Sequence, residues 1–160
     1  MNRQILRYFL TIMVLGWMIL IFLFSAQPAE ISSDLSGTLS YEIVDAWDRL
    51  TGVEETEQRI LERAAKIDHP VRKTAHMTEY AVLAMLVTGM FWVYGVRLRK
   101  NSLYTILVCF LYAGTDEFHQ LFIQGRAGRF SDVLIDTAGA AVGILVIRLV
   151  VRFCECMGRG

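Results

Sequence analysis

The stretch LYTILVCFLYAGTDEFHQLF, residues 103–122, is apolar for most of its length but carries Asp116, Glu117, His119 and Gln120 in its last two turns. About twenty residues of α-helix span about 30 Å, the thickness of the hydrocarbon core of a membrane. Unpaired polar groups are costly in hydrocarbon, so ionisable residues inside a spanning segment have partners or a function. The stretch therefore predicts a membrane-spanning helix with a polar end.

The whole chain has the composition of a small membrane protein. Of its 160 residues 54% are hydrophobic, and the charged residues lie mostly in blocks between long apolar runs. Sixteen basic and sixteen acidic residues cancel, and no polybasic tract indicates a nucleic-acid partner. The three cysteines, Cys109, Cys154 and Cys156, lie in an apolar run and in the C-terminal tail, so a disulfide framework is not expected.

Four apolar segments predict an all-α, polytopic fold. The expected transmembrane helices cover about residues 8–24, 74–94, 103–122 and 133–151, and we treat residues 1–160 as one domain. The first segment resembles a signal peptide in its flanking arginines. Its apolar core of about 17 residues is longer than usual, however, and no small-x-small cleavage site follows it, so we expect a retained span.

The flanking charges predict the orientation in the cell membrane. Lys and Arg residues precede the first span, fill the connection between spans two and three, and end the chain. Because such residues collect on the cytoplasmic side, we expect a multi-pass protein with both termini in the cytoplasm. The long loop of about residues 25–73 is then extracytoplasmic.

This loop is expected to contain two helices. Ser32 or Ser33 would cap a helix that carries Leu39, Ile43, Ala46, Trp47 and Leu50 at helical spacing. Thr51-Gly52 would end it, and a second polar helix would cover residues 54–66, separate from a spanning helix that has Pro70 in its first turn. The helices would lie on the membrane surface or cap the bundle; a solvated, partly ordered loop is the alternative.

Polar residues from three spans are expected to meet at the outer end of the bundle, with no comparable set at the cytoplasmic end. On span four, Gly139 and Gly143 share a face with Asp132 and Asp136, so another helix should approach closely there. The candidate catalytic residues are Glu79, Asp116, Glu117 and His119. The candidate substrate-binding residues are Arg72, Lys73, His76, Tyr80, Gln120, Arg129, Asp132 and Asp136.

These groups allow two interpretations. They could satisfy one another across the helices, since buried charges persist when they are paired. Alternatively, His and carboxylates could transfer protons while Arg residues hold an anionic group such as phosphate. Arg126 counts among the bases of the set but is not selected as a candidate. No HExxH or comparably specific metal motif is present, so no metal ligand is named and the cofactor stays open.

Four motifs resemble those of the VanZ-like family of bacterial membrane proteins. They are FSAQP (24–28), RKTAHMTEYAVLAML (72–86), TDEFHQLFIQGRAGRFSDVLID (115–136) and TAGAAVG (137–143). The resemblance implies that the following positions belong to the family's pattern: Ser25, Gln27, Arg72, Lys73, His76, Glu79, Tyr80, Asp116, Glu117, His119, Gln120, Phe122, Gly128, Arg129, Asp132, Asp136 and Gly139.

The family is named for a member associated with low-level resistance to the glycopeptide teicoplanin. The resemblance therefore implies a protein of the cell envelope and, by analogy, an effect on teicoplanin susceptibility. Together with the polar set, it leads us to expect an outward-facing site that binds or modifies a lipid-linked molecule or an anionic headgroup, in contact with the lipid bilayer. The alternative is a noncatalytic structural or shielding protein whose polar cluster holds the helices together. Enzymatic activity stays open.

Overall fold

The computed structural model describes residues 2–157, apart from the side chains of Leu98, Arg99 and Glu155. Five helices cover most of this range: α1 (Arg3–Ser25), α2 (Ala29–Thr51), α3 (Glu57–Val93), α4 (Leu98–Gln120) and α5 (Phe130–Met157). The predicted all-α class is confirmed.

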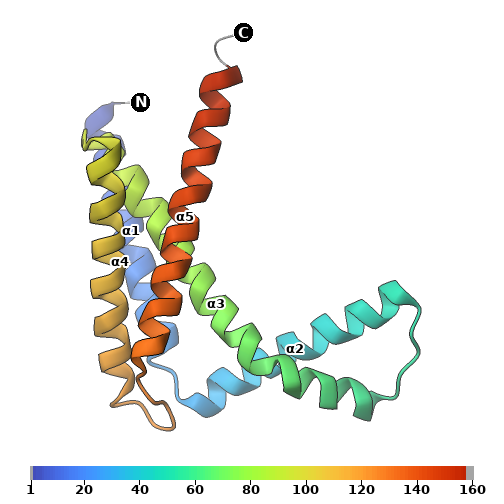
Figure 1. Ribbon diagram of the computed structural model, residues 1–160. Helices are drawn as coiled ribbons and strands as arrows, with labels where there is room; N and C mark the ends of the chain where they lie inside the picture. Colours follow the sequence, from blue (N-terminus) through green and yellow to red (C-terminus); the bar gives the residue numbers. More distant parts are fainter. Residues whose placement is uncertain (1, 158–160) are drawn as a thin grey trace.

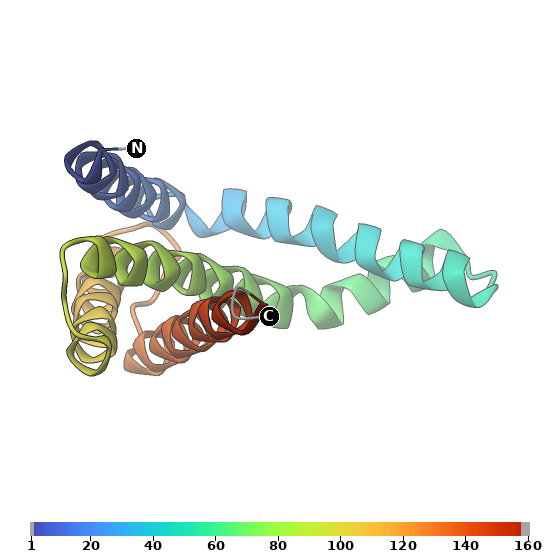
Figure 2. The ribbon, with the colours of Figure 1, turned by 90° about the horizontal axis from the view of Figure 1, so that it is seen from above.

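Helix α3 is the centre of the molecule, because it contacts each of the other four helices. Its C-terminal part forms a bundle with α1, α4 and α5, while its N-terminal part pairs with α2 in a hairpin that projects from the bundle (Figures 1 and 2). Both chain termini lie at the same end of the bundle (Figure 1). We call this the terminus end, and we call the opposite end, where the hairpin leaves the bundle, the hairpin end.

Three of the five helices described within residues 2–157 are long and apolar enough to cross a membrane: α1, α3, and α5 over Phe130–Cys154. Helix α4 is not among them, because polar residues at both of its ends lower its hydropathy. Large apolar side chains on the outside of the bundle, such as Phe9, Ile12 and Leu149, are more than half exposed. Such a surface suits hydrocarbon surroundings, so the chain is a membrane protein.

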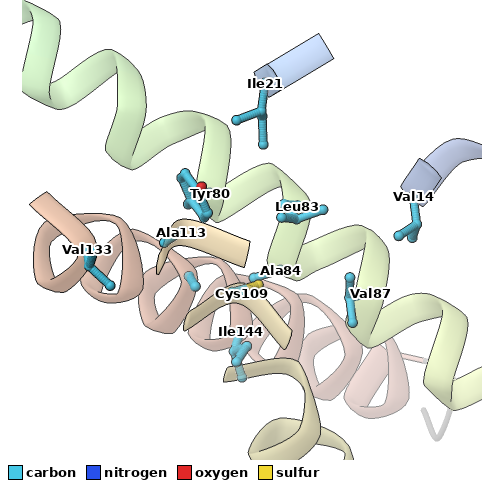
Figure 3. Packing of buried hydrophobic residues seen from close by; sticks show 11 residues of the cluster. Val14, Ile21, Tyr80, Leu83, Ala84, Val87, Cys109, Ala113, Val133 and Ile144 are labelled. Atoms are coloured by element: carbon cyan, nitrogen blue, oxygen red, sulfur yellow. The ribbon is translucent and has the colours of Figure 1, made fainter. Parts of the chain in front are cut away.

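The core of the bundle forms where side chains of α3 meet the other three helices. Tyr80, Leu83, Ala84 and Val87 of α3 are fully buried, and they lie between α1 on one side and α4 and α5 on the other (Figure 3). Small residues such as Ala113 of α4 keep these helices close. The core thereby fixes the positions of the four helices at the hairpin end, where the predicted polar residues lie.

The expected close approach at Gly139 and Gly143 is confirmed, and α3 is the partner. A Cβ at Gly139 would lie 2.2 Å from the carbonyl oxygen of Met77, and one at Gly143 would lie 2.1 Å from that of Ala81. Only a residue without a side chain allows the α3 backbone to come this near.

The hairpin has a small core of its own, in which Val44 of α2 packs on Ile60 and Ala64 of α3. Near its tip, Arg63 donates to Asp48 at 2.8 and 2.9 Å and to Glu55 at 3.0 Å. Helix α2 ends at Thr51, and the C-cap Gly52 that follows has a left-handed φ of 71°, so the predicted break at Thr51-Gly52 is confirmed.

Two predictions about this region are wrong. Ser32 and Ser33 lie inside α2, which begins after Pro28 without a side-chain cap. Pro70 lies inside α3 and not in a first turn, since the second polar helix and the second span are one continuous helix of 37 residues. An internal proline costs about 3 kcal/mol. Packing of Ile60 and Ala64 on α2 holds the segment before it in place.

The apolar stripe of α2 is exposed and does not form the buried face of the helix. Leu39, Ile43, Trp47 and Leu50 are between 44% and 85% exposed, whereas Ser36, Ser40, Val44 and Asp48 form the buried face. The stripe is therefore free to contact the bilayer.

The terminus end contains a buried polar network, contrary to expectation. Asn101 of α4 donates from Nδ2 to the carbonyl oxygen of Thr88 at 3.0 Å, and its Oδ1 accepts from Thr105 at 3.2 Å. The two threonine hydroxyls are 3.3 Å apart. The network has no charged member, so the placement of charged residues along the sequence does not reveal it.

Candidate functional site

The hairpin end contains a cavity of about 220 Å³, which we call the polar cavity. It is bounded by α3, the C-terminal turn of α4, the α4–α5 connection and the first turns of α5. Its lining residues are Ala29, His69, Arg72, Lys73, His76, Glu117, Gln120, Gly125, Arg126, Ala127, Arg129, Asp132 and Asp136. Four bases face three acids, so the lining has an excess of one positive charge while both histidines are neutral.

Two of the bases are neutralised by carboxylates. Lys73 of α3 forms an ion pair with Asp132 of α5 and so joins the two helices. Arg72 donates to Asp68 one turn earlier at 2.7 Å and to the hydroxyl of Ser33 in α2 at 3.0 Å. These contacts place both cations on the wall of the cavity. Each cation still has N–H groups that could donate hydrogen bonds to a bound molecule.

Arg126 is held differently. Its Nε donates to the carbonyl oxygen of Gln27 at 2.8 Å, and its Nη2 donates to that of Phe24 at 3.3 Å. Within residues 2–157 no carboxylate lies within 4 Å of this half-buried guanidinium. Burial lowers the pKa of Arg126, yet an arginine stays protonated in proteins. A positive charge that forms no ion pair within the described residues thus lies on the cavity wall, while Asp116, Glu117 and Glu79 attract it from a greater distance.

The acids at this end have structural contacts of their own. Glu117 accepts the backbone N–H of Arg129 at 2.8 Å and so ties α4 to the start of α5. Gln120 donates to Ser25 at 2.9 Å and to Asp116 at 3.3 Å, which connects α4 to the end of α1. Asp136 is 3% exposed and reaches the cavity from α5.

His76 lies where the polar cavity meets a second one. This second cavity, of about 330 Å³, is called the apolar cavity here. Its lining residues are Phe24, Gln27, Ser32, Leu35, Ser36, Leu39, Val71, Arg72, Ala75, His76, Glu79 and Arg126. The Nδ1 atom of His76 is 3.4 Å from a carboxylate oxygen of Glu79, so the pair is placed to exchange a proton with a bound group.

The structure brings most of the candidate residues together. Eight line the polar cavity, namely Arg72, Lys73, His76, Glu117, Gln120, Arg129, Asp132 and Asp136, and Glu79 lines the apolar one.

Three candidates line neither cavity. Asp116 is buried behind Gln120. Tyr80 is fully buried in the bundle core, with its ring centroid 6.1 Å from that of Tyr112. His119 packs on Phe22 of α1, at 4.5 Å between ring centroids. Tyr80 and His119 therefore have contacts typical of packing.

Sequence reasoning did not select Arg126, although it lines both cavities. The feature of the sequence that could have indicated Arg126 is its position in GRAGR (125–129), the short connection between two polar helix ends. Its partners are main-chain oxygens of the last turn of α1 and of the α1–α2 connection, which a side-chain pattern does not show.

Six buried polar atoms have no hydrogen-bond partner within the described chain, and all belong to α3 or to the last turns of α4. They are Asp68 Oδ1, Arg72 Nε, Glu79 Oε2, Tyr80 OH, Asp116 Oδ1 and His119 Nδ1. Glu79 Oε2 is the oxygen that lies 3.4 Å from His76 Nδ1, a contact without the geometry of a hydrogen bond. Burying such atoms unpaired is costly, which indicates that the hairpin end is not optimised for stability alone. In residues 2–157, no three His, Cys, Asp or Glu side chains are grouped so that they could hold a metal ion.

The fold and the cavity define a class: a helical membrane protein with a charged cavity at one end of its bundle. The family model VanZ/LLP1 matches residues 10–151, so the chain belongs to this family, and the resemblance seen in the sequence is confirmed. Comparisons with curated proteins and with solved structures gave no match.

Proposed function

We propose that this protein is a four-span protein of the cell envelope whose polar cavity binds the anionic headgroup of a lipid-linked molecule. Helix α4 would be the fourth span, since it runs beside α3 and α5 through the bundle. Lys and Arg near the terminus end, such as Arg7, Lys100 and Arg152, would place that end in the cytoplasm. The polar cavity would then open toward the outer leaflet.

The observation that carries this proposal is Arg126. A half-buried guanidinium held by two carbonyl oxygens, with no carboxylate within 4 Å in the described range, keeps its charge for a ligand. Guanidinium groups form short, charge-assisted hydrogen bonds with phosphate oxygens. Arg129 and Lys73 line the same cavity and would share the charge of a phosphate.

The site also has groups for acid–base chemistry on a bound molecule. His76 and Glu79 lie beside Arg126 at the border of the two cavities. If the bound molecule is modified, these two residues are the ones placed to move a proton. In a cell envelope, binding or modification of a lipid-linked precursor would change susceptibility to teicoplanin, which acts on such precursors outside the membrane.

Binding of a phosphate-bearing lipid to the purified protein tests the proposal. The protein would be placed in phosphatidylcholine nanodiscs, and its affinity for phosphatidic acid would be measured for the wild type, Arg126→Gln and Arg152→Gln. Arg152 is exposed near the terminus end, so its replacement is a control with the same loss of charge. Losing a charge-assisted contact should weaken binding about tenfold or more in Arg126→Gln, with the control unchanged.

The structural alternative has specific support, because Gln120 joins α1 to α4 and Glu117 joins α4 to α5. It predicts no preference for phosphatidic acid over phosphatidylcholine in any of the three proteins. That result would leave the polar cluster as a device for holding helices together.

A further inference from the structure

The apolar cavity adjoins the polar cavity and differs from it in chemistry. Its walls include Phe24 from α1, Leu35 and Leu39 from α2, and Val71 and Ala75 from α3. It therefore lies between the hairpin and the end of α1. Apolar side chains in these positions suit a hydrocarbon group, while Arg72, His76, Glu79 and Arg126 lie at the side of the cavity that faces the polar one.

The two cavities share Arg72, His76 and Arg126. One face of this border has charged and hydrogen-bonding groups, whereas the other has apolar ones. Arg72 is fixed to α2 through the hydroxyl of Ser33, and its buried Nε has no partner within the described chain. The border thus matches the junction of an amphiphilic molecule, where a polar head meets a hydrocarbon chain.

The apolar cavity is continuous with the exposed apolar stripe of α2. Leu35 and Leu39 line the cavity and are 63% and 50% exposed, and Ile31, Ile43 and Trp47 continue the same side of the helix. A chain inside the cavity would therefore meet this apolar surface where it leaves the cavity.

We propose that the apolar cavity holds the hydrocarbon chain of the same lipid whose anionic head occupies the polar cavity. This inference rests on the proposed function. It adds that the ligand is a lipid with a hydrocarbon chain, and that this chain points from the polar cavity into the apolar one. The polar cavity, at about 220 Å³, is smaller than the roughly 300–1,000 Å³ typical of small-molecule sites, so it fits a compact head such as a phosphate group. The chain passes between α2 and α3 beside His76.

The contribution of the chain to binding is steric. In a bilayer the chain is already surrounded by hydrocarbon, so moving it into an apolar cavity brings no large gain in free energy. The cavity lets the head enter the polar site while the chain stays in apolar surroundings. Filling the cavity should therefore exclude a long-chain phosphate and leave a soluble phosphate unaffected.

Ala75→Trp tests this, because Ala75 is an exposed residue on the wall of the apolar cavity. In phosphatidylcholine nanodiscs, the variant should bind phosphatidic acid about tenfold more weakly than the wild type does. Its affinity for glycerol 3-phosphate, which has the head and no chain, should not change. Leu50→Trp is the control, since Leu50 is 85% exposed on α2 and lines neither cavity.

A second measurement does not depend on the stability of a variant. Phosphatidic acid with a photoreactive diazirine in its acyl chain should label wild-type residues 32–39 and 71–79 on irradiation, and excess unlabelled phosphatidic acid should remove this labelling. Labelling spread evenly over the outside of α1 and α5 would overturn the proposal. So would Ala75→Trp binding both phosphates as the wild type does, or losing both equally. If the wild type binds neither phosphate, the proposed function fails as well; if it binds both and the chain labels elsewhere, only this inference fails.

Discussion

The two ends of the bundle bury polar side chains in opposite ways. At the terminus end, Asn101, Thr88 and Thr105 are at most 8% exposed, and they bind one another at 3.0 to 3.3 Å. At the hairpin end, Asp68 and Asp116 each keep a buried oxygen without a hydrogen-bond partner within residues 2–157, and charged residues line a cavity. Both ends are built on α3 and α4.

The difference distinguishes a polar cluster that only holds helices together from one whose groups are available to a ligand. A cluster that only joins helices can be small, neutral and satisfied, as the network around Asn101 is. The hairpin end has more charge and more unpaired atoms than joining helices requires, and unpaired buried groups reduce stability. Proteins keep such costs mainly where function needs them.

The largest expected effect is a loss of stability when the close contact between α5 and α3 is disrupted, because this contact joins the two ends of the bundle. Gly139→Val or Gly143→Val would place side-chain atoms against the carbonyl oxygens of α3, which cannot move aside as a side chain can. We expect a loss of about 3 kcal/mol or failure to fold, measured as thermal unfolding in detergent. Gly89→Ala is the control, since no atom lies within 4 Å of a Cβ there, and it should not destabilise the protein. Unchanged stability of both valine variants would contradict the packing described.

A ligand should stabilise one end and not the other. Phosphatidic acid at a hundredfold excess over its dissociation constant should stabilise the folded protein by about 2.7 kcal/mol. Slower amide hydrogen exchange is expected in residues 69–79 and 117–132, because these segments surround the polar cavity, with little change around Asn101. Equal protection at both ends would show that the effect is not specific to the cavity.

Removing the satisfied network should cost moderate stability. In Asn101→Ala the carbonyl oxygen of Thr88 and the hydroxyl of Thr105 each lose a hydrogen bond. The first bond joins α4 to α3 and the second lies within α4; at about 1 kcal/mol for each buried hydrogen bond, a loss of about 1–2 kcal/mol is expected. Binding of phosphatidic acid should be unchanged, and a loss of binding without a loss of stability would contradict the assignment of this network to packing.

The smallest effect is expected at Tyr80, in the opposite direction. Its hydroxyl is buried without a partner in the described chain, so Tyr80→Phe removes an unsatisfied group and keeps the ring. Stability should be unchanged or should rise by up to about 1 kcal/mol. A clear loss, measured beside Asn101→Ala in the same unfolding assay, would mean that the hydroxyl has a partner in the folded protein.

Much of the fold follows from local patterns in the sequence. The four apolar runs predict α1, α4, α5 and the C-terminal part of α3, and the glycine pair on α5 predicts its close approach to α3. The continuity of α3 through Pro70 does not follow, because local rules count the cost of a proline and not the packing of the preceding segment on α2. The orientation of α2 is also tertiary: spacing predicts an apolar stripe, on the membrane surface or against the bundle, but it does not show that Ser36, Ser40 and Asp48 form the side that is buried.

The sequence alone determined which kind of site to look for. Helical spacing and the placement of charges at one end of three segments selected twelve candidates, and eight of these line one cavity in the folded protein. Tertiary structure decided which side chains are available. In the folded protein His119 packs on Phe22, and Tyr80 is buried in the core. Arg126 donates hydrogen bonds to main-chain oxygens of a segment about a hundred residues earlier. The reason is physical: charge and spacing are properties of the chain, but whether a charge has a partner depends on which distant backbone folds beside it.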